Sequence, residues 1–116
     1  MTGQMTQEGV KEYQSMVLKL YLQLPETPSK ASSHDRKTAA MLHASGFSVD
    51  TVESALLLAS LRRLGRSSDM PSLSPIRSLA YFFPVIQEML ANPVPKDYVE
   101  HLREKLLRLS QKIQSG

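Results

Sequence analysis

The stretch "GFSVDTVESALLLASLRR", residues 46–63, decides the fold class of this chain. Gly46 accepts the left-handed conformation that ends a helix, and Ser48 is a favoured N-cap, so a turn followed by a helix is predicted. The segment "ALLLASL" is apolar nearly all round, which indicates a helix buried in a core. Arg62 and Arg63 fall in its last turn, where cations compensate the helix dipole. We therefore interpret this stretch as a core helix with a basic end.

Apolar residues repeat with helical spacing near both ends of the chain. The spacing 3, 4, 3, 4 joins Val10, Tyr13, Val17, Leu20 and Leu24, and it returns at Val99, Leu102, Leu106, Leu109 and Ile113. Each set places one apolar stripe along a helix. We predict helices near residues 6–24 and 95–113, the first of them ended by Pro25.

Two further helices are predicted between these stripes. One begins at Ser32 or Ser33 and ends before Gly46. The other lies in "IRSLAYFFPVIQEMLAN", the aromatic centre of the expected core, where Tyr81 is expected to be buried. Pro84 interrupts that pattern, so the helix is either kinked there or begins there after a short turn capped by Ser78 or Ser74.

These elements define an all-α fold, because strand signals are weak throughout. We expect one domain, residues 1–116, forming a compact bundle of about five helices with a helix-turn-helix-like centre. Mobile loops are expected at about residues 25–33 and 66–75, with a frayed C-terminus. The helices near 6–24 and 95–113 are expected to pack on each other, and they could also form a homodimer.

Composition excludes several classes of function. The chain has no cysteine, so disulfides, thiolate catalysis and cysteine zinc sites are excluded. It shows no signal peptide, and its longest apolar run is too short for a membrane helix, so we expect a cytoplasmic protein without membrane contact. Residues 59–116 carry nine Lys/Arg and five Asp/Glu, against five and six in residues 1–58, so the basic excess is C-terminal.

No constellation of catalytic residues is visible. The three histidines His34, His43 and His101 lack the i, i+4 spacing of a helical metal pair. The five glycines are scattered and form no phosphate-binding loop. We expect no enzyme activity, no cofactor and no metal.

The residues "GFSVDTVESA" resemble the turn and second helix of lactose-repressor-type DNA-binding domains. The resemblance implies a helix-turn-helix. However, Asp50 and Glu53 on the exposed face would repel phosphates, and no Arg, Asn or Gln in the first turns could read bases. The likeness therefore reflects the chemistry of the turn and not a reading surface.

A longer segment, residues 33 to about 91, is similar to the C-terminal helical module of DnaD-type bacterial and phage replication proteins. The matching positions are Gly46, Phe47, Ser48, Val52, Ala55, Leu56, Ser78, Leu79, Tyr81, Val85 and Ile86. The resemblance implies an accessory role in bacterial DNA replication or mobile-element maintenance. It also implies weak DNA binding without sequence preference, or binding to a protein partner. Pro84 and the lack of tryptophan depart from the family pattern.

The candidate nucleic-acid-binding residues are basic: Arg62, Arg63, Arg66, Arg77, Lys105 and Arg108. The four arginines could converge around residues 66–76 as a phosphate-contacting patch, which the two residues of the last helix would extend. An exposed Tyr81 could stack a base. The alternative is a protein-interaction adaptor, or a small homodimer, without nucleic-acid binding; it predicts an exposed apolar patch instead of a basic face.

Overall fold

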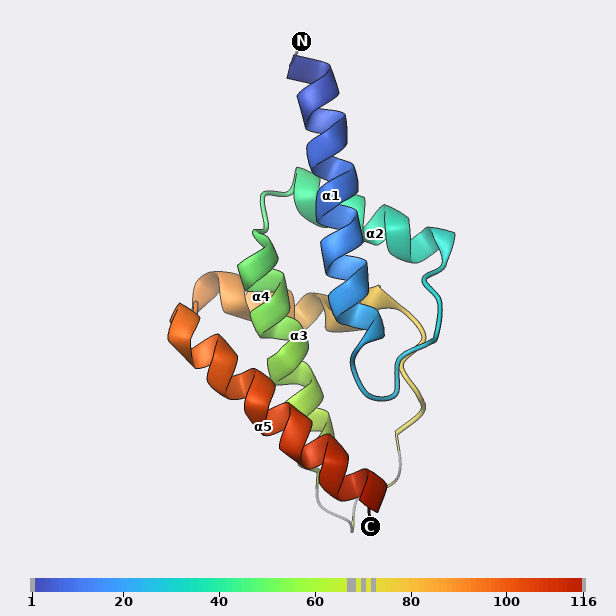
Figure 1. The fold of residues 1–116 in the computed structure, drawn as a ribbon, viewed down its shortest axis with the longest axis vertical. Coiled ribbons are helices and arrows are strands. Elements are labelled where there is room, and N and C mark those ends of the chain that lie inside the picture. Colours follow the sequence, from blue (N-terminus) through green and yellow to red (C-terminus); the bar gives the residue numbers. More distant parts are fainter. Residues whose placement is uncertain (1, 67–68, 70, 72, 116) are drawn as a thin grey trace.

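The computed structural model describes residues 2–66, 69, 71 and 73–115, with side chains described only between residues 9 and 111. These residues form five α-helices and one 3₁₀ turn, without a strand, so the predicted all-α class is confirmed (Figure 1). In chain order the elements are α1 (Thr2–Leu22), α2 (Ser33–Ala44), α3 (Val49–Leu64), η1 (Leu79–Phe82), α4 (Phe83–Ala91) and α5 (Lys96–Ser115).

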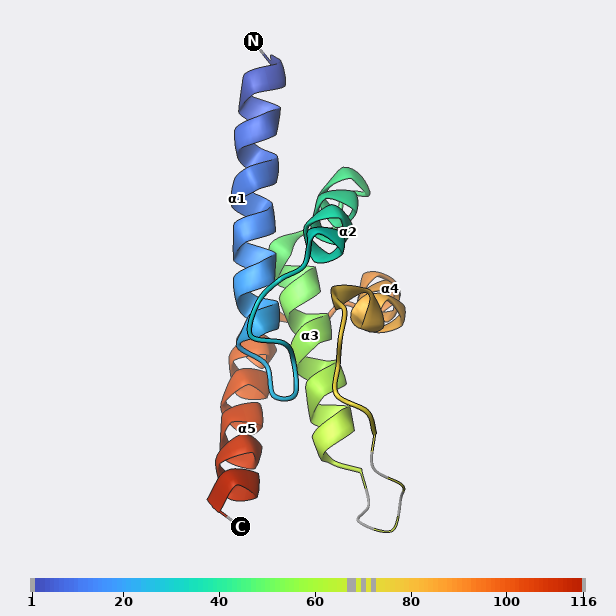
Figure 2. The same ribbon diagram turned by 90° about the vertical axis from the view of Figure 1, so that its right-hand side faces the viewer.

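Helix α3 is the centre of the fold, because α1, α4 and α5 all pack against it. In the side view, α1 and α5 follow one another along one side of α3, and α2 and α4 lie on the other side (Figure 2). Helix α2 packs on α1 and on η1, and η1 also contacts α3 and α4. The apolar circumference of α3 explains this arrangement, since each of its sides can bury another helix.

The expectation that the first and last helices pack on each other is wrong. Val17 in α1 and Leu102 in α5 are almost inaccessible, but α5 packs on α3, and α1 packs on both α2 and α3. The two stripes are therefore alike in spacing and are covered by different neighbours. Periodicity shows that a helix has a buried face, but it does not identify the partner that covers this face.

The predicted boundaries of α2 and α3 are confirmed by their caps. The Ser32 hydroxyl accepts a hydrogen bond from the backbone of Asp35, whose carboxylate accepts one from the backbone of Ser32, which completes a capping box. Ser48 caps α3 by accepting from the N–H of Thr51. Gly46 has φ +86°, a conformation that L side chains rarely adopt, so glycine is suited to this turn.

Pro84 lies at the beginning of α4 and does not kink a longer helix. The 3₁₀ turn η1 precedes it and is capped by the Ser78 hydroxyl, which accepts from the N–H of Ala80. Proline is suited to a first helical turn because the N–H that it lacks has no helical partner there. Of the two alternatives that the sequence left open, the short turn is therefore observed.

Residues 25–32 lie between α1 and α2 and belong to no helix, while Ser33, the last residue of the mobile loop expected at about 25–33, begins α2. The mobility of this loop stays a prediction. The mobile loop expected at residues 66–75 includes residues 67, 68, 70 and 72, and the expected frayed terminus includes residue 116. Those positions lie outside the described residues.

Candidate functional site

Arg63 is buried, with 8% of its surface exposed, and its guanidinium joins three separate segments. Its Nε donates to Oε2 of Glu26 at 2.7 Å, one Nη donates to the Tyr81 hydroxyl at 3.3 Å, and the other donates to the carbonyl of Ser74. Burial lowers the pKa of Arg63, but the hydrogen bonds to Glu26 and Tyr81 and the charge of Glu26 outweigh this effect and raise it. The side chain therefore stays charged and organises the loops that surround it.

A backbone hydrogen bond strengthens the same junction. The N–H of Ile76 donates to the carbonyl of Glu26 at 2.9 Å, so the loop after α1 runs beside the segment that leads into η1. Ile76 is also buried in the core. Both the loop after α1 and the end of α3 therefore help to hold η1 in place.

Two of the predicted phosphate-binding residues are already engaged within the chain. Arg63 cannot present its guanidinium to a phosphate because it is buried and paired, so this part of the sequence prediction is corrected. Arg62 is exposed, but both of its terminal nitrogens donate to the carboxylate of Glu88, at 2.8 and 2.6 Å. This pair lowers the pKa of Glu88 and leaves Arg62 with a compensated charge.

Arg66 and Arg77 remain on the surface. Arg66 donates to the carbonyl of Pro71 at 3.0 Å, and Arg77 forms no ion pair with any residue that the structure describes. Arg77 lies between Ser74, which Arg63 contacts, and η1. It is therefore held close to the Arg63 junction while its own side chain faces solvent.

Tyr81 is exposed, with 46% of its surface accessible, so the expectation of a core tyrosine is wrong. Within η1, Leu79 and Phe82 point into the core, which turns Ala80 and Tyr81 outward. Two contacts hold the ring of Tyr81. The guanidinium carbon of Arg63 lies over the ring, 5.6 Å from its centroid, and the ring of Phe82 meets it edge-on, with the two ring centroids 5.1 Å apart. An exposed aromatic ring is thus fixed in place by a buried cation and by the core.

Lys105 and Arg108 form a separate group on α5. Both are exposed, and with Tyr98 and His101 they repeat at spacings of 3, 4 and 3, which places all four on one face of the helix. The Tyr98 and His101 rings lie 5.5 Å apart. The six candidate cations therefore do not form one patch.

The two acidic side chains in the first turns of α3 are both paired with cations of α5. Asp50 is exposed and lies 3.8 Å from the ammonium of Lys96, while Glu53, whose side chain is only 14% exposed, accepts a 2.5 Å hydrogen bond from Arg103. The expectation that both carboxylates lie on an exposed face is therefore corrected for Glu53. The remainder of α3 is mostly buried, as predicted for a core helix. The first turns of α3 also lack Arg, Asn and Gln, the side chains that most often read bases in a major groove.

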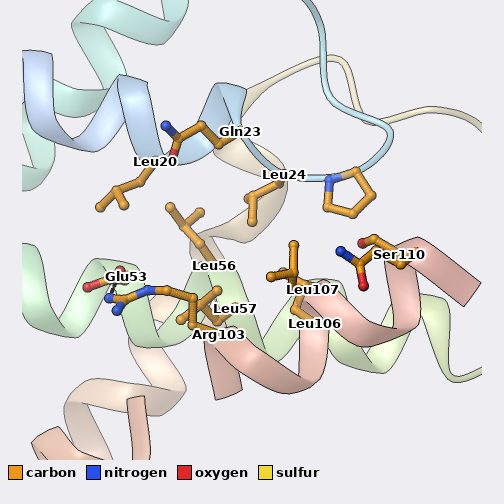
Figure 3. A pocket seen from close by; sticks show the side chains of 12 residues that line it. Leu20, Gln23, Leu24, Glu53, Leu56, Leu57, Arg103, Leu106, Leu107 and Ser110 are labelled. Atoms are coloured by element: carbon orange, nitrogen blue, oxygen red, sulfur yellow. Dashed lines mark hydrogen bonds and ion pairs between the residues drawn. The ribbon is translucent and has the colours of Figure 1, made fainter. Parts of the chain in front are cut away.

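An apolar groove of about 630 Å³ lies between the end of α1, the middle of α3 and α5. Six leucines line it: Leu20, Leu24, Leu56, Leu57, Leu106 and Leu107. Figure 3 shows them gathered around the groove, with the Glu53–Arg103 pair close by. The groove has no signal in the sequence, because it depends on how α1 and α5 are placed along α3.

Among the described residues, no group of acidic or histidine side chains could hold a metal ion, and no helix is long and apolar enough to cross a membrane. Comparison with known proteins finds no matching family model, no matching curated protein and no matching solved structure.

Proposed function

We propose that this chain is a non-catalytic binding module that contacts nucleic acid through Tyr81, Arg66 and Arg77. The observation that carries the proposal is the exposed ring of Tyr81, which Arg63 holds from behind. A base can stack on such a ring whatever its identity, because every base has a π face. The two surface arginines would contact the phosphates on either side.

Single-stranded nucleic acid is the better ligand for this arrangement. The unstacked bases of a single strand can reach Tyr81, whereas the bases of a duplex are enclosed. Stacking is worth about 1–3 kcal/mol per base. For a single strand, two phosphate contacts predict a slope of about −1.4 when the logarithm of the association constant is plotted against the logarithm of the salt concentration. We therefore expect weak, salt-dependent binding without sequence preference.

A wider role in bacterial DNA replication or mobile-element maintenance belongs to the same proposal. It is supported by the likeness of residues 33 to about 91 to DnaD-type modules, and the residues of η1 are among those that carry it.

The test is fluorescence anisotropy of a labelled single-stranded oligonucleotide, and of its duplex, across a series of salt concentrations. The variants are Tyr81→Leu and the double change Arg66→Glu with Arg77→Glu. The double change Lys105→Glu with Arg108→Glu is the matched control, because it reverses the same number of exposed charges on another surface. Arg63 is left unchanged in both variants, because its buried guanidinium holds Glu26, Ser74 and Tyr81.

We expect the wild-type protein to bind the single strand more tightly than the duplex. Tyr81→Leu should weaken binding about tenfold, the equivalent of one lost stacking contact. The Arg66/Arg77 variant should also bind more weakly, and its association constant should depend less steeply on salt concentration than that of the wild type. If the Lys105/Arg108 variant loses binding and the others keep it, the interface lies on α5 and the proposal for Tyr81 is wrong. No binding at low salt would reject nucleic acid as a ligand altogether.

A further inference from the structure

We infer that the hydroxyl of Tyr81 is an anion-binding donor, which gives a hydrogen bond to a phosphate oxygen of the ligand. This role rests on the proposed function and adds a second contact at the same residue. A base would stack on the ring, and the hydroxyl at the edge of the ring would hold the sugar–phosphate backbone. The phosphates would then meet a neutral donor as well as the cations Arg66 and Arg77.

The hydrogen bond between Arg63 and Tyr81 can run in one direction only. A guanidinium has five N–H donors and no acceptor, so Nη1 of Arg63 donates and the hydroxyl oxygen of Tyr81 accepts, at 3.3 Å. The phenolic proton takes no part in this bond. Because a phenol both donates and accepts, Tyr81 keeps its own O–H for another partner.

The O–H of Tyr81 is directed to solvent. Within the part of the chain that the structure describes, the hydroxyl has no hydrogen bond other than the one from Arg63, and 46% of the residue is exposed. The positive charge of Arg63 repels the phenolic proton, which therefore points away from the guanidinium. The hydroxyl thus offers a proton at the surface.

Arg63 is anchored so that this direction is set before a ligand arrives. Each nitrogen of its guanidinium meets a different group: Nε meets the carboxylate of Glu26, one Nη meets the carbonyl of Ser74, and the other meets Tyr81. The side chain of Arg63 is only 5% exposed. Binding at a preorganised donor loses less conformational freedom, and a hydroxyl that accepts from a cation is polarised into a stronger donor.

An anionic oxygen suits this donor best. Hydrogen bonds to ionised acceptors are about twice as strong as those to neutral ones, and a nucleic acid presents such an oxygen at every phosphate. Glu26 carries the opposing negative charge at the junction, but it is paired with Nε of Arg63. The exposed side chains of Arg66 and Arg77 add positive charge on the sequence before and after this junction.

Tyr98 is a matched comparison within the same chain. It is also 46% exposed, and its ring lies 5.5 Å from that of His101. No cation among the described residues donates to its hydroxyl. The two tyrosines therefore differ in the contact with Arg63 and not in exposure, so a response of Tyr81 alone would be due to its surroundings.

The first experiment follows the wild-type protein, carrying isotope-labelled tyrosine, by NMR during titration with inorganic phosphate. The reference titration uses sodium chloride at equal ionic strength. The Cζ resonance of each ring reports on hydrogen bonding by its hydroxyl. We expect the resonance of Tyr81 to shift to saturation with phosphate and that of Tyr98 to stay in place. Equal shifts of the two resonances, or no shift of Tyr81, would overturn the inference.

The second experiment measures binding of the single-stranded oligonucleotide by Tyr81→Phe and Tyr98→Phe. Tyr81→Phe should weaken binding about threefold, less than Tyr81→Leu, because the ring remains and only the hydrogen bond is lost. Its salt dependence should stay that of the wild type, since a neutral phenol releases no counterion. Tyr98→Phe should bind like the wild type. Urea unfolding of both variants checks that the fold is kept.

The two experiments separate this role of Tyr81 from the proposed function. If Tyr81→Phe binds the strand as tightly as the wild type, the hydroxyl contacts no phosphate and the inference is wrong, while stacking on the ring still stands. If the wild-type protein binds no oligonucleotide but phosphate shifts Tyr81 alone, nucleic acid is rejected as the ligand and the anion-binding hydroxyl is supported.

Discussion

The backbone N–H of Leu79 donates a hydrogen bond of 3.0 Å to Oδ1 of Asp35, although the two residues are 44 positions apart. The other carboxylate oxygen, Oδ2, accepts from the N–H of Ser32 at 3.0 Å. Asp35 is almost completely buried, so one carboxylate both starts α2 and holds the first residue of η1. Because η1 carries Tyr81, this contact also positions the surface that we propose for nucleic acid.

Asp35→Ala should be strongly destabilising. It removes the capping box, worth about 1 kcal/mol, and leaves the N–H of Leu79 buried without an acceptor, which costs about 1–3 kcal/mol. Urea unfolding should therefore show a loss of about 2–4 kcal/mol. Asp50→Ala is the control, since Asp50 occupies the first turn of α3 but is exposed, and its loss should cost under about 1 kcal/mol. Equal losses would mean that the bond to Leu79 contributes little.

The neighbours Arg62 and Arg63 should differ in their effect on stability. Arg63→Met removes a buried cation that holds Glu26, Ser74 and Tyr81, and we expect a loss of about 3 kcal/mol. Arg62→Ala breaks only an exposed pair with Glu88 and should cost less than about 1 kcal/mol. Guanidinium unfolding of both variants measures the difference. The prediction is wrong if the two midpoints shift equally.

Two glycines should respond to alanine in opposite directions. Gly46→Ala forces a side chain into a backbone with φ +86° and should cost about 1–2 kcal/mol. Gly9 lies within α1, and a Cβ there would meet nothing within 4 Å, so Gly9→Ala should add up to about 1 kcal/mol. Thermal unfolding of the two variants shows whether each change lowers or raises the stability. A neutral Gly46→Ala would show that the turn can adjust.

Stability should fall in alkali because of Tyr13 and Tyr21. Burial raises the pKa of each to about 12, from 10, and the charge of Asp35 adds to the effect for Tyr21. The unfolded chain loses these protons above pH 10 and the folded chain keeps them up to about pH 12, so the free energy of unfolding decreases between these values.

The double variant Tyr13→Phe with Tyr21→Phe tests this pH dependence. Neither hydroxyl has a hydrogen-bond partner among the described residues, so we expect the variant to be as stable as the wild type at pH 7, or slightly more stable. Its loss of stability above pH 10 should be smaller than that of the wild type. Tyr98→Phe, at an exposed ring, should leave the wild-type curve unchanged.

The sequence by itself determined the elements whose causes are local. The caps Ser32, Ser48 and Ser78 act on residues two or three positions away, and Gly46 ends α2 through its own backbone conformation. The apolar periodicity of α1 and α5 likewise depends only on residues that are three or four positions apart. These signals sufficed for the fold class, for the boundaries of α2 and α3, and for the prediction that α3 is a core helix.

The tertiary structure decided every feature that joins distant residues. Arg62 and Arg63 are neighbours of the same type, yet one is exposed and the other buried, because Glu26 and Ser74 meet only Arg63. Tyr81 is exposed because η1 turns Phe82 inward. The placement of α1 and α5 in succession on α3 leaves the groove open beside Leu107. Burial, charge pairing and grooves depend on which faces come together in space, and no local pattern encodes that choice.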